Sequence, residues 1–184
     1  MHYLAKYILR RLGWKCITQG QFKKKFVLVA APHTSNWDFP LMLFFGFALN
    51  LNYNWLGKHT LFFWPLGGLM KKLGGIPVNR TKKNSYVSNL AERISEKERC
   101  ILIIPPEGTR SRTDYWKSGF IHIAKEASVP IVFANLDYKN RSLKFSDGCC
   151  YSRSASEIIQ VARGFYKNSF PLHPKKFGPV RLKP

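Results

Sequence analysis

The sequence predicts an α/β fold in which a mostly parallel central sheet is flanked by helices. Short, continuous apolar runs such as 26–31 and 100–104 alternate with segments of helical periodicity such as 85–96. Continuous apolar runs are typical of strands that are covered on both faces, as in parallel sheets. The 184 residues contain no internal repeat and no Gly- or Ser-rich linker, so we expect a single domain over residues 1–184.

The elements can be assigned in order along the chain. Residues 2–14 have the spacing of a short basic amphipathic helix, and we expect residues 1–15 to lie on a membrane surface, with packing against the domain as the alternative. The strand at 26–31 runs into a turn and then a helix whose first turn contains Pro40. Strands are also expected at 53–57, 74–78, 100–104 and 129–133. Further helices are expected at 85–96, at 120–127 and after Ser154, where Ser154 and Glu157 form a capping box.

Charge and aromatic content narrow the function classes. The formal net charge is +20, and no acidic residue precedes Asp38. Such a field attracts polyanions, which leaves nucleic acid, anionic lipid surfaces and phosphorylated substrates as partners. The chain also carries 14 Phe, 8 Tyr and 5 Trp, more than a small core needs, so we expect a hydrophobic ligand or interface.

The sequence predicts a peripheral protein on the cytoplasmic face of a membrane, with no signal peptide and no transmembrane span. The first 15 residues mix charge throughout, unlike a secretory signal. The strongly apolar stretch at 39–51 is too short to cross a bilayer. The four cysteines have neither metal-type spacing nor a disulfide framework, which favours a reducing compartment.

Unusual polar residues follow three of the predicted strands. They are His33 and Asp38 after the first, Asn79–Arg80 after 74–78, and 107–111 after 100–104. Since ligands of parallel α/β sheets bind beyond the carboxyl ends of the strands, we expect these residues to converge on one site.

His33 and Asp38 have the spacing of a proton-transfer pair. A carboxylate separated from the histidine by four residues can fold back onto one imidazole nitrogen, which leaves the other nitrogen to take a proton from an alcohol. No nucleophilic Ser or Cys motif is present, so we expect direct attack by a substrate hydroxyl. A structural hydrogen bond is the alternative for an isolated His–Asp pair.

The segment from Glu107 to Ser111 has the composition of a phosphate-binding turn. Gly108 lets the backbone approach a ligand closely, and Arg110 offers a planar fork that matches phosphate oxygens. Arg80 is a candidate second phosphate contact. A surface turn with a salt bridge is the alternative reading.

Taken together, four ordered blocks resemble the glycerolipid acyltransferase family, whose best-known members are the lysophosphatidic acid (1-acylglycerol-3-phosphate) acyltransferases. The blocks are His-Thr-Ser-Asn-Trp-Asp, which includes a His-x4-Asp motif, then Gly-Gly-Ile-Pro-Val-Asn-Arg, Pro-Glu-Gly-Thr-Arg-Ser and Val-Pro-Ile-Val. The resemblance covers about residues 26–135 and implies a glycerol-phosphate acyltransferase-like fold.

The resemblance also implies roles for individual residues. His33 would be the general base and Asp38 its orienting partner. The acceptor would be bound by a larger set of residues: Lys58, Arg80, Glu107, Gly108, Thr109 and Arg110. The family uses acyl-CoA or acyl-carrier protein as donor, without metal or organic cofactor. The basic ends of the chain predict a membrane surface that contains anionic lipids as a further partner.

Several alternatives stay open. The expected reaction acylates a lysophospholipid such as 1-acylglycerol-3-phosphate to phosphatidate. However, Pro77 and Asn79 stand where phosphatidate-forming members more often have a bulky residue and an acid, so another lysolipid acceptor, such as lyso-ornithine lipid, is the first alternative. A non-catalytic basic protein that binds lipid or nucleic acid is a more remote one. No recognised nucleic-acid motif is present, so we expect no specific nucleic-acid partner.

Overall fold

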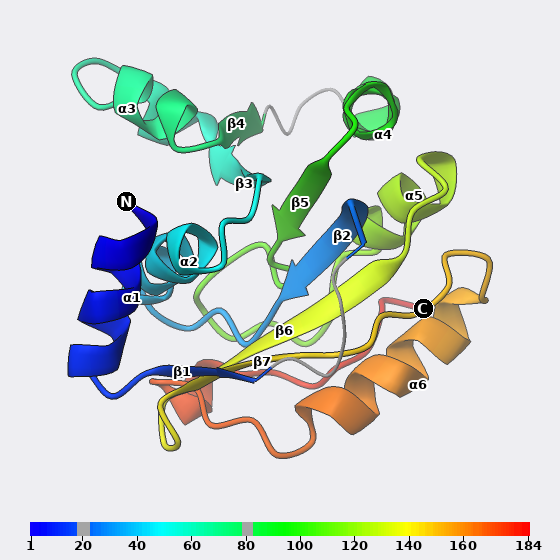
Figure 1. Ribbon diagram of the computed structural model, residues 1–184. Helices are drawn as coiled ribbons and strands as arrows, with labels where there is room; N and C mark the ends of the chain where they lie inside the picture. The colour runs from blue at the N-terminus through cyan, green and yellow to red at the C-terminus, as the bar shows by residue number, and fades with distance from the viewer. Residues whose placement is uncertain (18–22, 79–82) are drawn as a thin grey trace.

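A single sheet organises the computed structural model, which describes residues 1–17, 23–78 and 83–184 (Figure 1). Across these residues the strand order is β1-β7-β6-β2-β5-β3-β4. Neighbouring strands pair in parallel, except for the antiparallel pair β6 and β7. The strands are β1 (Lys15–Ile17), β2 (Lys25–Ala30), β3 (Tyr53–Lys58), β4 (Gly75–Val78), β5 (Cys100–Ile104), β6 (Ile131–Asp137) and β7 (Ser142–Phe145). The predicted α/β class with a mostly parallel sheet is confirmed.

Helices cover both faces of this sheet, as expected for strands that are apolar throughout. On one face lie α1 (His2–Arg11) and α2 (Asp38–Ala48), and on the other lie α4 (Lys83–Glu96), α5 (Gly119–Glu126) and α6 (Ala155–Tyr166) (Figure 1). A short 3₁₀ turn, η1 (His59–Phe62), and the helix α3 (Gly67–Lys72) lie at the β3–β4 edge, and η2 (Pro174–Lys176) follows α6. The predicted capping box of α6 is present, with reciprocal bonds between Ser154 and Glu157.

The strands supply a core on each side of the sheet. β5 is buried along its whole length, and in β2 the side chains of Phe26, Val27 and Val29 are fully buried. Alternate side chains of β2 point to opposite faces, so Val27 and Val29 pack with α4–α6 while Phe26 and Leu28 pack with α1 and α2. The central strands are therefore fixed on both faces, which makes their carboxyl ends a rigid platform.

Two strands were not expected from the sequence. β1 is only three residues long, and β7 is a four-residue strand that reverses direction after β6. Neither has the long apolar run that identified the central strands, because both lie toward the edge of the sheet. The reversal after β6 matters for the site because it positions Tyr138, the first residue beyond β6.

The helix α1 packs against the domain and also carries an exposed apolar face. Ala5 and Leu9 are buried in the core cluster that includes α2, whereas Tyr3, Leu4 and Tyr7 are exposed. The two readings of this segment are therefore compatible with each other. Among the described ranges, no helix has both the length and the apolar character needed to cross a bilayer.

Candidate active site

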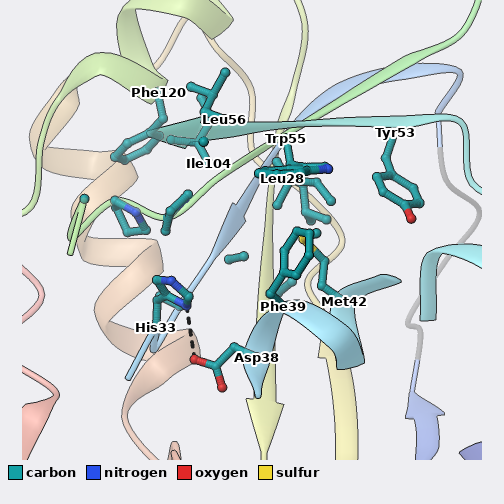
Figure 2. Close-up of a pocket in the computed structure, with 18 of the residues that line it drawn as sticks. Leu28, His33, Asp38, Phe39, Met42, Tyr53, Trp55, Leu56, Ile104 and Phe120 are labelled. Carbon is teal, nitrogen blue, oxygen red and sulfur yellow. Dashed lines mark hydrogen bonds and ion pairs between the residues drawn. The ribbon is translucent and has the colours of Figure 1, made fainter. Parts of the chain in front are cut away.

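His33 and Asp38 form a hydrogen-bonded pair at the carboxyl end of β2. Nδ1 of His33 lies 3.1 Å from Oδ2 of Asp38 (Figure 2). The imidazole is partly exposed and the carboxylate is almost completely buried. The turn that follows β2 brings the two together because Asp38 is the first residue of α2, where a carboxylate also suits the positive end of the helix dipole.

The Asp38 carboxylate is held by four donors. Its Oδ2 accepts hydrogen bonds from the backbone N–H groups of Thr34 and Ser35, at 2.9 and 3.0 Å, in addition to His33. Its Oδ1 accepts one from the hydroxyl of Tyr138 at 2.6 Å. Burial would raise the pKa of Asp38, but hydrogen bonds from His33, Tyr138 and the Ser35 backbone outweigh burial and hold this pKa below its ordinary value. The carboxylate is therefore ionised at neutral pH.

An ionised Asp38 determines the tautomer of His33. A carboxylate can only accept, so Nδ1 carries the proton and points it at Asp38. Nε2 then keeps its lone pair, and it has no hydrogen-bond partner among the residues that the structure describes. Because His33 lines the large cavity described below, this nitrogen is a base that a bound hydroxyl can reach.

Tyr138 is a member of this network that the sequence analysis did not identify. It lies 100 residues beyond Asp38 and belongs to none of the four blocks. Its ring packs edge-to-face on Trp14, with the centroids 5.3 Å apart. Burial and the neighbouring Asp38 carboxylate both raise the pKa of Tyr138, so its hydroxyl stays protonated and donates. No local pattern could have revealed it, since the contact depends on the reversal between β6 and β7.

Glu107 supports the loop of His33 from behind. It follows β5, the parallel neighbour of β2, and its Oε1 accepts a hydrogen bond from the backbone N–H of His33 at 3.2 Å. Its side chain is buried, and Oε2 has no partner within the described part of the chain. Burial raises the pKa of Glu107 to about 7. This placement assigns Glu107 a contact with the His33 backbone, while its contact with a substrate stays a prediction.

A cavity of about 860 Å³ opens beside the pair. This volume is at the upper end of the range for small-molecule sites. Figure 2 shows His33 at one end of the cavity, with Leu28, Phe39, Met42 and Trp55 lining the space beyond the imidazole. The walls come from β2, α2, β3 and β5 and are mainly aliphatic and aromatic. The cavity therefore suits a long apolar chain whose reactive end lies at His33.

Cationic side chains gather at the same cavity. Lys58, Arg110 and Lys117 all line it and are all exposed. Arg110 donates a hydrogen bond through Nη1 to Oδ1 of Asn36, in the loop between His33 and Asp38. The phosphate-binding residue expected at 110 thus lies next to the proton-transfer pair, and Lys117 adds a cation that the sequence analysis did not single out.

The loop geometry explains the glycine at 108. Gly108 has a φ of +64°, and a Cβ there would lie 2.7 Å from Nζ of Lys117. The glycine therefore permits both the turn and the close approach of the lysine. Thr109 is exposed and lines the cavity, and its hydroxyl accepts a hydrogen bond from the backbone N–H of Ser111.

Most of the predicted site is thus brought together. His33, Asp38, Lys58, Gly108, Thr109 and Arg110 all line one cavity, and Glu107 lies directly behind it. Arg80 and Asn79 lie outside the residues that the structure describes. The expected convergence at the carboxyl ends of β2 and β5 is confirmed.

Comparison with known proteins gives one family. A family model described as Acyltransferase matches residues 14–135. A 1-acyl-sn-glycerol-3-phosphate acyltransferase from Cocos nucifera is 35% identical over 83 residues, which cover 42% of this chain and 27% of that protein. A protein of the same name from Haemophilus influenzae is 31% identical over 123 residues, which cover 63% of this chain and 50% of that protein. The chain thus spans half or less of the length of these relatives.

A solved structure supports the fold. The crystal structure of the 1-acyl-sn-glycerophosphate (LPA) acyltransferase PlsC from Thermotoga maritima superposes with a TM-score of 0.60 at 18% identity, covering 92% of this chain and 79% of that one. The superposition covers a larger share of this chain than the family model does, so the shared fold extends beyond residues 14–135.

Proposed function

Since the chain belongs to the acyltransferase family, we propose that it transfers a fatty acyl group from a thioester to the hydroxyl of a lysophospholipid. The single observation that carries this proposal is the ionised Asp38 behind Nδ1 of His33, with Nε2 facing an apolar cavity. The names of the two curated relatives favour 1-acylglycerol-3-phosphate as the acceptor and phosphatidate as the product.

The reaction needs one proton acceptor and one proton donor, and His33 serves as both in turn. Nε2 takes the proton of the acceptor hydroxyl as its oxygen attacks the thioester carbonyl carbon, which forms a tetrahedral intermediate. The intermediate collapses by breaking the C–S bond, and the imidazolium returns the proton to the departing thiolate. The products are an ester and a free thiol. Asp38 stabilises the imidazolium between the two steps.

The remaining residues bind and orient. The phosphate of the acceptor would lie near Arg110, Lys58 and Lys117, the exposed cationic side chains that line the cavity. The acyl chain would occupy the apolar part, between α2 and the sheet. The donor is acyl-CoA or acyl-carrier protein, and no metal or organic cofactor takes part in the proposed steps.

We place the enzyme at a membrane surface because its substrates are amphiphiles and its charge is strongly positive. The exposed face of α1 carries Tyr3, Leu4 and Tyr7 beside basic residues such as Arg10 and Arg11. Basic residues near an anionic leaflet contribute about 1 kcal/mol each. This helix would lie in the headgroup layer while Ala5 and Leu9 hold it to the domain.

Release of free thiol from palmitoyl-CoA tests the proposed function. The acceptor panel would contain 1-acylglycerol-3-phosphate, other lysophospholipids and lyso-ornithine lipid. We expect acceptor-dependent thiol release by the wild type and none above background by His33→Ala. His122→Ala is the matched control, because His122 is exposed on α5 and does not line the cavity.

Each outcome has a defined meaning. A preference for 1-acylglycerol-3-phosphate supports the proposed acceptor, and a preference for lyso-ornithine lipid replaces it while keeping the chemistry. Equal thiol release by the wild type and His33→Ala with every acceptor would remove the catalytic role of His33.

A further inference from the structure

The segment between β3 and β4 presents a cluster of large apolar side chains to solvent. Phe63, Trp64 and Leu66 connect η1 to α3, with Leu61 before them and Leu69 after them. Trp64 is 94% exposed and Phe63 is 65% exposed. These five residues, which we call the η1–α3 surface, lie within nine positions of the chain. Soluble proteins rarely expose contiguous apolar side chains of this size without a partner.

The fold holds this surface outward. The ring of Phe62 stacks on Trp55, with the centroids 5.8 Å apart, and Nε1 of Trp55 donates to the carbonyl of Leu73. Gly67 packs so closely on the backbone of Phe62 that a Cβ at Gly67 would lie 2.0 Å from the carbonyl oxygen of Phe62. The buried side of the segment is thus anchored to β3, and the apolar side chains on the other side do not fold back onto the domain.

The charge around the η1–α3 surface favours one partner. Lys58, Lys71 and Lys72 flank it and are exposed, and the sequence has no Asp or Glu between Asp38 and Glu92. Apolar side chains next to cations match a bilayer that contains anionic lipids. A second copy of this chain fits less well, because each copy carries a formal charge of +20 and like charges repel.

The η1–α3 surface adjoins the cavity that contains His33. Leu61 and Lys58 line the cavity that contains His33, as does Met70 of α3. In Figure 1, α3 and the N-terminal end of α1 lie toward the same side of the molecule. The η1–α3 surface therefore lies on the same side of the domain as the N-terminal end of α1 and is continuous with the cavity wall at Leu61.

We propose that the η1–α3 surface is a second membrane-contact element, which inserts its aromatic side chains into the headgroup layer beside the cavity. Together with α1 it gives the enzyme two separate contacts with an anionic bilayer. Lipid acceptors and products would then pass between the bilayer and the cavity along the wall formed by Leu61 and Met70. Binding to the bilayer does not depend on the acyl-transfer chemistry, whereas the passage of acceptors and products rests on the proposed function.

Vesicle sedimentation tests the proposal directly. Sucrose-loaded vesicles of phosphatidylcholine and phosphatidylglycerol at 4:1 would be titrated with the wild type and with the double variant Phe63→Ser/Trp64→Ser. Both native side chains are exposed, so the substitutions leave the core intact. We expect the double variant to bind at least about tenfold more weakly. The matched control is Phe170→Ser/Leu172→Ser, an exposed apolar pair that follows α6 in the chain and lies outside the η1–α3 surface. We expect its binding to stay within twofold of the wild type.

A second variant distinguishes insertion of Trp64 into the bilayer from unfolding of the protein. Trp64→Phe keeps an aromatic ring, so we expect it to bind vesicles nearly as well as the wild type but to lose the largest part of the blue shift of tryptophan emission. Unchanged binding by Phe63→Ser/Trp64→Ser, or an unchanged blue shift in Trp64→Phe, would overturn the proposal. A lipid-free dimer of the wild type that the double variant abolishes would assign the surface to a second copy instead.

The proposed function can fail independently of this result. With a short-chain lysophosphatidate below its micellar concentration, we expect Phe63→Ser/Trp64→Ser to release thiol at the wild-type rate while its vesicle binding is weakened. Absence of thiol release in both proteins would refute the acyl-transfer proposal and leave the vesicle result to decide the membrane contact.

Discussion

The most informative perturbation removes the negative charge of Asp38 while keeping the size and shape of its side chain. Asp38→Asn keeps an oxygen that can accept from the backbone N–H groups of Thr34 and Ser35 and from Nδ1 of His33. The new amide nitrogen would face the hydroxyl of Tyr138, whose oxygen can accept in place of donating. The substitution therefore removes the negative charge while the hydrogen-bond geometry and the His33 tautomer are preserved.

The separation of the pair sets the size of the effect. A unit charge on the imidazole and one on the carboxylate, 3.1 Å apart, interact by about 5 kcal/mol at an effective dielectric constant of about 20. Solvent reaches part of the imidazole, so we expect the rate to lose about 3–5 kcal/mol of transition-state stabilisation. Since each 1.36 kcal/mol is a factor of ten, kcat should fall by roughly 10² to 10⁴.

Single-turnover thiol release measures this loss without interference from product release. We expect the rate constant to fall while the affinity for the lysolipid and the midpoint of thermal unfolding change little. A rate within about fivefold of the wild type, in a variant whose circular dichroism is unchanged, would refute the assignment of Asp38 as the group that stabilises the imidazolium.

Four further predictions follow from the same contacts. Tyr138→Phe removes the one donor to Oδ1 of Asp38 that the described residues provide, so we expect a loss of about 1.5–3 kcal/mol in the free energy of unfolding, measured in urea. We also expect a lower kcat, whereas a merely structural role for Tyr138 would leave kcat unchanged. For Glu107 the folded-state pKa of about 7 lies above the ordinary value of 4.5, so its contribution to stability is present below pH 4.5 and is lost as the pH rises through 7. We therefore expect the free energy of unfolding of the wild type to fall by about 3 kcal/mol relative to that of Glu107→Gln over that interval. The same difference in unfolding free energy between the two proteins at pH 4.5 and at pH 7.5, measured in urea, would contradict this. Arg110→Ala should raise the KM for a phosphorylated acceptor by about tenfold or more with a smaller effect on kcat, and an equal effect on a non-phosphorylated acceptor would exclude a phosphate contact. Met42→Trp adds bulk to the cavity wall, so we expect competition assays to show a shift toward shorter acyl donors, whereas an unchanged preference would place the chain elsewhere.

The central part of the fold was predictable because local patterns determine it. The strands β2 and β5 are continuous apolar runs, and α4 and α6 carry their buried residues at helical spacing. The strands β1 and β7 were not predictable, since each is short and contains a lysine, so neither forms a continuous apolar run.

In the candidate site, too, local contacts were predictable from the sequence and tertiary contacts were not. His33 and Asp38 belong to one turn, so their contact could be inferred from spacing alone. Tyr138 and Lys117 reach the site through the tertiary fold, and no spacing in the sequence connects them to Asp38 or Gly108. The cavity was anticipated only as an excess of aromatic residues, because its walls come from segments that are distant in the sequence.

The turn between β2 and α2 contains most of what proton transfer requires. The base, the carboxylate and two of the carboxylate's donors lie within residues 33–38. Under the proposed reaction, substitutions in the cavity walls formed by α2 and β3 would therefore change which lipid is bound without altering the His33–Asp38 pair. Engineering of selectivity should accordingly target those walls and leave residues 33–38 unchanged.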